Sequence, residues 1–201
     1  MPVRNVNKPD IADAYYHVYF RGLNKQEIFR DEADYKVFVS FFDRYLTRAQ
    51  RRSPFGVYPH LRGRVELLCY CLMPNHVHLL LYQIESAAMS QLMRGLLTSY
   101  SRYFNNKYRR SGPLFETRYK ASYIDSETYL VHITRYIHMN PRYWKRYRYS
   151  SIQFYLGVTP APEWLQYERL EEMTPAQYLS FCQSYQGNKD ALRQLKDELA
   201  T

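Results

Sequence analysis

A long apolar run interrupted by one turn signal constrains the fold of this chain more than any other feature. Residues 67–82 are almost wholly apolar or aromatic, and Pro74 and Asn75 divide them into two halves. Two apolar runs with a turn between them are typical of adjacent β-strands. Because residues i and i+2 of a strand point to one face, His76 and His78 are expected to project together.

Two imidazoles side by side on a rigid strand can form half of a divalent-metal site. The spacing alone does not require this, because the pair can equally be two hydrogen-bonded histidines at a sheet surface. Val77, Leu79 and Leu81 are expected to face the opposite way, into a core. A second chemical element is therefore needed before a site is indicated.

That second element lies near the end of a helical pattern. Ser126 is the expected N-cap, and Pro141 ends the helix because it disfavours the α conformation at Asn140. His132, Tyr136 and Asn140 stand at i, i+4 and i+8, so they form one polar row on this helix. A packed tyrosine whose hydroxyl is satisfied by a neighbour would give the same pattern.

Taken together, these elements resemble the single-tyrosine HUH transposases, and among them the REP-associated tyrosine transposases of bacteria. The matching segments follow the order of that family and cover roughly residues 14–170. They are the first-strand segment 16–22 with the turn 28–31, the His-Val-His strand 73–78, the stretch 112–120, the helix motif 136–141 and the tail 149–157.

The resemblance implies roles for particular residues. Tyr136 would be the nucleophile, His76 and His78 would bind a divalent metal ion, Mg²⁺ or Mn²⁺, and Asn140 stands where relatives place a third polar ligand. His132 could act as a base or orient a ligand. Attack by a tyrosine on a DNA phosphodiester would leave a 5′-phosphotyrosine and a free 3′-hydroxyl, which permits strand transfer.

Periodicity along the chain predicts an α+β fold. Its order, β-α-β-β-α-β and then a helix, predicts a ferredoxin-like antiparallel sheet with an appended helix, on which Tyr136 lies as the nucleophile that the resemblance implies. We expect residues 1–13 to be a mobile N-terminus, 14–141 the catalytic domain and 142–201 a helical extension. The expected strands are 15–21, 64–72, 76–82 and 118–124, the helices 31–50, 88–107, 126–140, 175–185 and 190–199, and a loop 53–60.

The charge pattern favours a polyanionic partner, although a solvated basic face would give a similar count. The net charge is +9, and from Glu163 onward acids outnumber bases by seven to four, so the positive charge lies earlier in the chain. Rings alternate with cations over residues 143–149, which is typical of single-strand binding. The expected DNA-binding residues are Arg109, Arg110, Arg118, Lys120, Arg142, Trp144, Lys145, Arg146 and Arg148.

The cysteines and the apolar segments bear on location. Cys69, Cys71 and Cys182 form neither a CxxC pair nor an even set for disulfides. No run approaches the roughly 20 apolar residues of a membrane span, and no signal-peptide core is recognisable. We therefore expect a cytoplasmic protein without a membrane partner. The resemblance favours action as a monomer, and a homodimer remains open.

The motifs and the family they resemble predict a metal-dependent endonuclease and strand transferase that acts on single-stranded or hairpin DNA. Two alternatives remain open. The chain could be a ferredoxin-like module that binds nucleic acid without catalysis, or a metal-dependent hydrolase in which Tyr136 has no part. A covalent protein–DNA adduct would separate the prediction from both.

Overall fold

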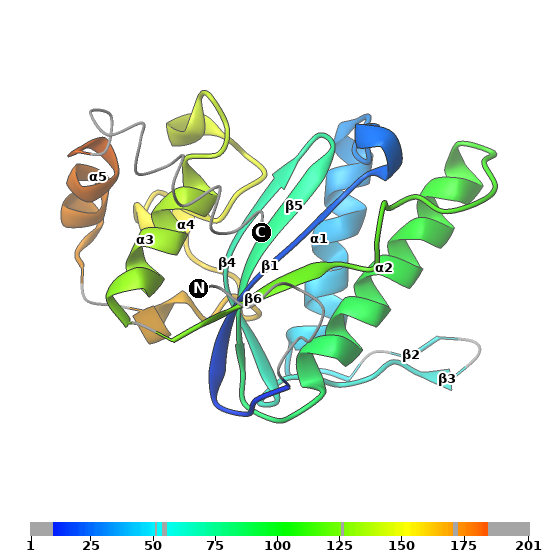
Figure 1. Cartoon of the computed structure of the whole chain (residues 1–201), viewed down its shortest axis with the longest axis horizontal. Coiled ribbons are helices and arrows are strands. Elements are labelled where there is room, and N and C mark those ends of the chain that lie inside the picture. Colours follow the sequence, from blue (N-terminus) through cyan, green and yellow to red (C-terminus); the bar gives the residue numbers. More distant parts are fainter. Residues whose placement is uncertain (1–9, 51, 54–55, 126, 171–172, 185–201) are drawn as a thin grey trace.

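One antiparallel sheet organises the chain. The computed structural model describes all residues except 1–9, 51, 54–55, 126, 171–172 and 185–201 (Figure 1). The sheet has the order β4-β5-β1-β6, so β5 and β1 lie in its centre and β4 and β6 form its edges. Its strands are β1 (Ala14–Arg21), β4 (Val65–Met73), β5 (His76–Gln83) and β6 (Lys120–Ile124). This order confirms the predicted ferredoxin-like arrangement.

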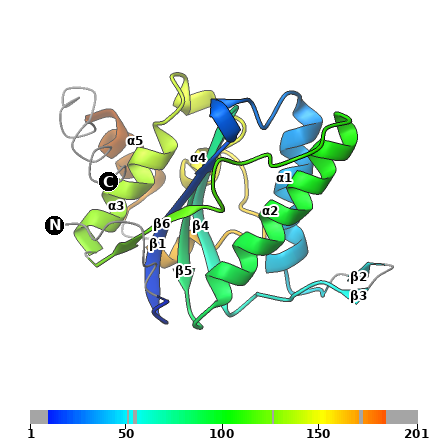
Figure 2. The ribbon, with the colours of Figure 1, turned by 45° about the vertical axis from the view of Figure 1, so that its right-hand side comes forward.

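Two helices cover one face of the sheet, α1 (Glu32–Leu46) and α2 (Ala88–Lys107) (Figures 1 and 2). Asp31 caps α1, because its side chain accepts the backbone N–H of Asp34. Gly95 lets the two helices pack closely, since a Cβ there would lie 2.8 Å from the ring of Tyr45. The core beneath them includes Tyr16, Val18 and Phe20 of β1, and Val77, Leu79 and Leu81 of β5.

The helix α3 (Glu127–His138) lies on the other face (Figure 2). It encloses a second core, formed by Leu68, Cys69, Cys71, Leu80, Ile124, Leu130, Ile133, Tyr136 and Ile137. The predicted division of β5 is therefore confirmed, because Val77, Leu79 and Leu81 face α1 and α2 while the histidines face α3. The two-residue period of the strand produces this division.

The C-terminal extension packs along the open edge of the sheet. Its elements are η2 (Trp144–Arg146), α4 (Ile152–Tyr155), η3 (Tyr167–Leu170) and α5 (Pro175–Gln183). The backbone N–H of Leu72 donates to Tyr149 at 2.8 Å, and that of Gln166 donates to Leu67 at 2.8 Å. These bonds cover the exposed edge of β4, which would otherwise offer unpaired groups to another chain.

Some element boundaries differ from the prediction. The helix α1 ends at Leu46, because the extended backbone of Thr47 stops it and the Thr47 hydroxyl donates to the carbonyl of Asp43. The strand β6 begins at Lys120 rather than at 118. The expected loop 53–60 contains part of a short strand pair, β2 (Arg52–Ser53) and β3 (Gly56–Val57), and η1 (Leu23–Lys25) follows β1.

Three expectations lie outside the described residues: the Ser126 cap, the helix 190–199 and the mobility of the first nine residues. Within the described ranges, no helix combines the length and the apolar character needed to cross a bilayer.

Candidate active site

The two histidines of β5 and a tyrosine of α3 form one cluster. The ring centroids of His76 and His78 are 5.1 Å apart, and that of His78 is 5.5 Å from the ring of Tyr136. His76 is half-buried, whereas His78 and Tyr136 are buried. Segments almost sixty residues apart in the sequence are thus brought together because α3 packs over the histidine-bearing face of the sheet.

Asn140, just beyond the end of α3, joins this cluster. Its Oδ1 lies 3.3 Å from Nε2 of His76, while Nδ1 of His76 lies 2.7 Å from Oδ1 of Asn75. Both partners are amide oxygens, which only accept, so a neutral His76 can donate to just one of them; the shorter contact favours a proton on Nδ1 and a lone pair on Nε2. That lone pair faces another acceptor, the Asn140 oxygen, which is an arrangement that a cation between them would stabilise.

The separation of these two atoms suits a shared ion. Ligand atoms that each stand about 2.1 Å from one metal ion lie about 3 Å from each other. Among the described residues there is no group of three or more His, Cys, Asp and Glu side chains that could hold a metal ion. The candidate donor set is two imidazoles and one amide. Such a set leaves coordination positions for substrate oxygens.

A third histidine, His17 of β1, contacts His78. Nε2 of His17 lies 3.0 Å from Nδ1 of His78, and the two rings stack with an interplanar angle of 7°. Burial lowers the pKa of His17 to about 3, so this ring is neutral at ordinary pH. The contact permits donation from His78 Nδ1–H to His17, which would leave the lone pair of His78 on Nε2, where it can bind a metal ion.

The Tyr136 hydroxyl is held in its neutral form. Burial raises the pKa of Tyr136, and a hydrogen bond with the Asn140 side chain opposes part of that rise. A bond that favours the phenolate is one donated to its oxygen, which agrees with the Asn140 oxygen lying toward His76. Tyr136 therefore needs a nearby cation or base before it can act as a nucleophile.

His132 has a different setting from the one expected for it. Its Nδ1 accepts from the Arg135 guanidinium at 2.7 Å, and its ring meets that of Phe181 at 5.5 Å. These are its contacts within the described part of the chain, and they belong to the side of α3 against which α5 packs. They do not support a role for His132 as a base or as a group that orients a metal ligand.

The predicted DNA-binding residues are distributed over several surfaces. Lys120 lies near the cluster, because its Nζ lies 5.6 Å from the ring of Tyr19, which in turn is 6.0 Å from that of His78. Arg148 lies 3.5 Å from Glu32. Exposed positions are taken by Arg109, Arg118, Arg142, Lys145 and Arg146, whereas Arg110 is half-buried.

Trp144 was expected to stack on a base, but the structure buries it. Its side chain is 6% exposed and packs with Ile152, Tyr178 and Cys182. The short helix η2 turns this ring inward, where burial of a large apolar surface is favourable. Tyr143, 74% exposed, is the accessible ring beside Arg142.

Sequence reasoning missed three residues of the cluster, His17, Tyr19 and Asn75. Asn75 could have been found, because it directly precedes His76 in the turn. The other two lie on β1, and the register that sets Tyr19 opposite His78 joins strands about sixty residues apart. Only a pairing between distant strands reveals them, which local periodicity does not encode.

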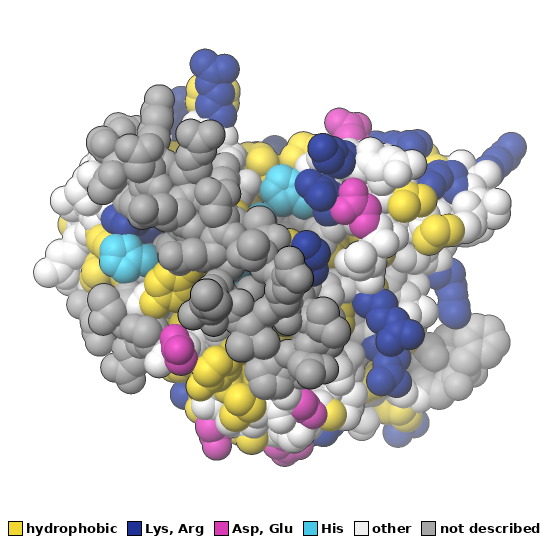
Figure 3. Space-filling view, viewed as in Figure 1, with side chains coloured by type: hydrophobic (Ala, Val, Ile, Leu, Met, Phe, Trp, Pro, Cys, Tyr) yellow, Lys and Arg dark blue, Asp and Glu magenta, His cyan; other side chains and the backbone are white. Residues whose placement is uncertain are grey.

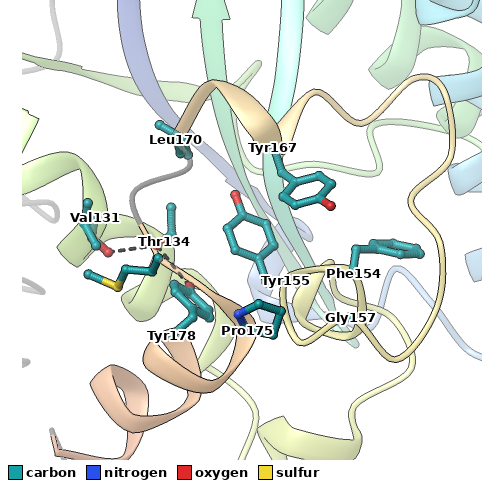
Figure 4. Close-up of a pocket in the computed structure, with 10 residues that line it drawn as sticks. Val131, Thr134, Phe154, Tyr155, Gly157, Tyr167, Leu170, Pro175 and Tyr178 are labelled. Carbon is teal, nitrogen blue, oxygen red and sulfur yellow. Dashed lines mark hydrogen bonds between the residues drawn. The ribbon is translucent and has the colours of Figure 1, made fainter.

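A cavity behind α3 is separate from this cluster. It has a volume of about 90 Å³ and lies between α3, α4, η3 and α5 (Figure 4). Its walls are mainly rings and aliphatic groups, among them Tyr155, Tyr167 and Tyr178. None of the clustered histidines lines it, so it is a packing gap of the extension rather than part of the site.

Comparison with known proteins gives two kinds of similarity. Residues 60–140, which contain His76, His78, Tyr136 and Asn140, match the family described as "Transposase IS200 like". The solved structure of a REP-associated tyrosine transposase bound to a REP hairpin is similar in fold, with a TM-score of 0.54 and 13% identity over 79% of this chain and 88% of that chain.

A second solved structure, a candidate transposase from Deinococcus radiodurans R1, has 18% identity over 65% of this chain and 93% of that chain, with a TM-score of 0.36. No protein with a curated description matches the sequence.

Proposed function

We propose that this chain, which belongs to the IS200-like transposase family through residues 60–140, cleaves and rejoins single-stranded DNA with Tyr136 as its nucleophile. The observation that carries the proposal is the convergence of His76, His78 and Asn140 beside the buried hydroxyl of Tyr136. Two imidazoles and an amide oxygen suit a divalent ion, and a tyrosine beside them suits attack on a phosphodiester.

His76, His78 and Asn140 would hold Mg²⁺ or Mn²⁺, which would stabilise negative charge on a phosphate oxygen. The chain's own residues prepare this arrangement. Asn75 and His17 each contact the Nδ1 atom of one histidine, and protons on these Nδ1 atoms would leave both Nε2 atoms free to bind the ion. The Asn140 side chain also forms a hydrogen bond with Tyr136 that opposes the rise in its pKa.

The reaction conserves the energy of the phosphodiester. The Tyr136 oxygen bonds to phosphorus, and the bond from phosphorus to the 3′-oxygen of the preceding nucleotide breaks. Tyr136 gives up one proton, and the departing oxygen gains one to become a 3′-hydroxyl. Because the phosphate stays esterified to the enzyme, a second 3′-hydroxyl can reverse the step with a new strand, which is strand transfer rather than hydrolysis.

Hairpin DNA is the proposed substrate. The solved relative of similar fold is bound to a REP hairpin, and Lys120 beside the cluster offers a cation for a phosphate. A single chain supplies every residue of the cluster, which supports action as a monomer. The three cysteines are buried and free, which fits the cytoplasmic location that the sequence favours.

A labelled hairpin oligonucleotide with a single-stranded flank, incubated with the protein and Mn²⁺, tests the proposal. A protein band that carries label on a denaturing gel, and that disappears with a chelator, is the expected result. Tight binding without any covalent band would instead favour a non-catalytic nucleic-acid module, and cleavage without a covalent band would favour a hydrolase.

A further inference from the structure

An open groove lies between α2 and the segment 113–119 that leads into β6. Its volume is about 980 Å³. The lining contains three arginines, Arg94, Arg102 and Arg118, several hydroxyl side chains and no acidic side chain. Figure 3 shows Lys and Arg side chains gathered over α2 on this face of the molecule. The groove therefore has the charge of a site for an anion.

The three arginines are available to a ligand. The salt bridges of the described residues use other cations, such as Arg21 with Glu116 and Lys107 with Asp31. All three arginines are exposed. Asp10 contributes an acidic charge near Tyr119 of the lining, but its carboxylate accepts from the Ser86 hydroxyl at 2.7 Å and from the Ala87 amide at 2.7 Å.

The spacing of the arginines selects an extended anion. Ser90, Arg94, Thr98 and Arg102 follow one another every four residues, so they form one stripe along α2. Each step rises about 6 Å along the helix, which puts Arg94 and Arg102 about 12 Å apart. A single phosphate can meet one of these arginines, whereas a polymer with regular phosphates can meet both.

The groove continues toward the active site around the edge of the sheet. Tyr119 lines the groove, and the next residue, Lys120, begins the edge strand β6 and pairs with Tyr19. The ring of Tyr19 stacks near His78. A chain lying in the groove therefore has a short basic route over Lys120 to Tyr136.

We propose that this groove binds the single-stranded DNA that extends from the segment held at Tyr136. The inference rests on the proposed function for the location of the cleaved bond. Arg94, Arg102 and Arg118 contact different phosphates of this strand, and the partly buried rings of Phe115 and Tyr119 line the groove where unpaired bases can stack. The groove thus secures the flank of the substrate, separately from the hairpin.

The test compares a hairpin that carries a flank of about 10 nucleotides, a length within the range that single-strand sites cover, with the same hairpin carrying a minimal flank. The groove variant is Arg94→Gln/Arg102→Gln. The control, Lys36→Gln/Arg48→Gln, removes the same charge from side chains that are 72% and 82% exposed. Affinities are measured over a range of salt concentrations.

The long flank is expected to raise the affinity of the wild type and of the control, and to give no gain in the groove variant. Two lost phosphate contacts should lower the log–log salt slope by about 1.4. Wild type should therefore lose about sevenfold more affinity than the groove variant between about 50 and 200 mM salt. Annealing a complementary strand to the flank should abolish the gain.

An unchanged gain in the groove variant would overturn the proposal, as would better competition by an acidic peptide than by single-stranded DNA. Adduct formation on the hairpin with a minimal flank separates a failure of the groove proposal from a failure of the proposed function. Wild type and groove variant should form equal adduct there. Absence of any adduct with wild type would reject the proposed chemistry, while the binding result would still decide the groove.

Discussion

At the scale of single residues, the chemistry of the cluster depends on which nitrogen of each histidine carries the proton. Asn75 contacts Nδ1 of His76, and His17 contacts Nδ1 of His78. The short Asn75 contact favours a proton on Nδ1 of His76, and the His17 contact permits one on Nδ1 of His78, so Nε2 of each ring can keep its lone pair for a metal ion. The Nδ1 atom of His17 is buried and has no hydrogen-bond partner among the described residues. A buried polar atom without a partner lowers stability, and an apolar side chain at this position would avoid that loss.

Replacing His17 with leucine, which has no ring nitrogen, should weaken Mn²⁺ binding by about 10–100-fold, because His78 then loses the partner that fixes its tautomer. Isothermal titration calorimetry measures the affinity, and far-ultraviolet circular dichroism checks the fold. The control is His60→Leu, since His60 contacts the carbonyl of Thr47 away from the cluster. Equal Mn²⁺ affinity in the His17 variant and wild type would show that His17 does not support metal binding.

Tyr143 and Trp144 are neighbours with opposite exposure, and they should respond differently to truncation. Trp144→Ala should lower the free energy of unfolding by about 3–5 kcal/mol, because a buried ring leaves a cavity. Tyr143→Ala should leave stability nearly unchanged and weaken single-strand binding by about 1–3 kcal/mol if its exposed ring stacks on a base. Urea unfolding and a binding titration separate the two effects. A Trp144 variant of unchanged stability, or a strongly destabilised Tyr143 variant, would contradict the exposures of these two rings.

At the scale of elements, the C-terminal extension fixes the helix that carries Tyr136. His138 at the end of α3 lies 2.7 Å from the Tyr178 hydroxyl of α5 and 2.7 Å from the Ser151 hydroxyl. The Tyr178 hydroxyl also donates to Thr134 of α3 at 3.0 Å. Buried polar groups that satisfy one another in this way define one packing arrangement. The extension therefore contributes to the position of α3.

The same histidine should make stability depend on pH. Burial lowers the pKa of His138 to about 3 from an ordinary value of 6.5. Between these values the unfolded chain binds a proton that the folded chain does not, so stability is complete above about pH 6.5 and falls as the pH decreases. From pH 7 to pH 5 this residue should account for a loss of about 2 kcal/mol.

Denaturant unfolding of wild type and His138→Gln at both pH values measures this effect. The glutamine variant should be less stable at pH 7 but should lose about 2 kcal/mol less on acidification. The His60→Gln variant should behave like wild type, because that substitution leaves the α3–α5 contacts in place. Parallel losses in wild type and His138→Gln would show that His138 is not the source.

At the scale of the whole molecule, the sequence predicted what local patterns determine. The two-residue period of β5 separated the histidines from Val77, Leu79 and Leu81, and the helical period of α2 predicted its bounds, 88–107. Contacts between distant segments could not be predicted in this way. The approach of His17 to His78 depends on strand register, the burial of Trp144 on the packing of α5, and the groove on the path of 113–119.

Because one chain supplies both histidines, Asn140 and Tyr136, activity should not be restored by mixing inactive variants. His78→Ala and Tyr136→Phe, each without cleavage activity alone, should remain inactive when combined at high concentration. The covalent band on a denaturing gel is the readout, with wild type diluted by the phenylalanine variant as a control for inhibition. Recovery of the band in the mixture would indicate that two chains share each site.

Mass spectrometry of a trapped adduct tests directly whether Tyr136 forms the bond to DNA. Wild type incubated with hairpin DNA and Mn²⁺ should yield a proteolytic peptide with a nucleotide attached at Tyr136. Tyr136→Phe, which loses only the hydroxyl, should bind the same hairpin and form no adduct. A nucleotide attached to another residue, or an adduct formed by the phenylalanine variant, would show that Tyr136 is not the nucleophile.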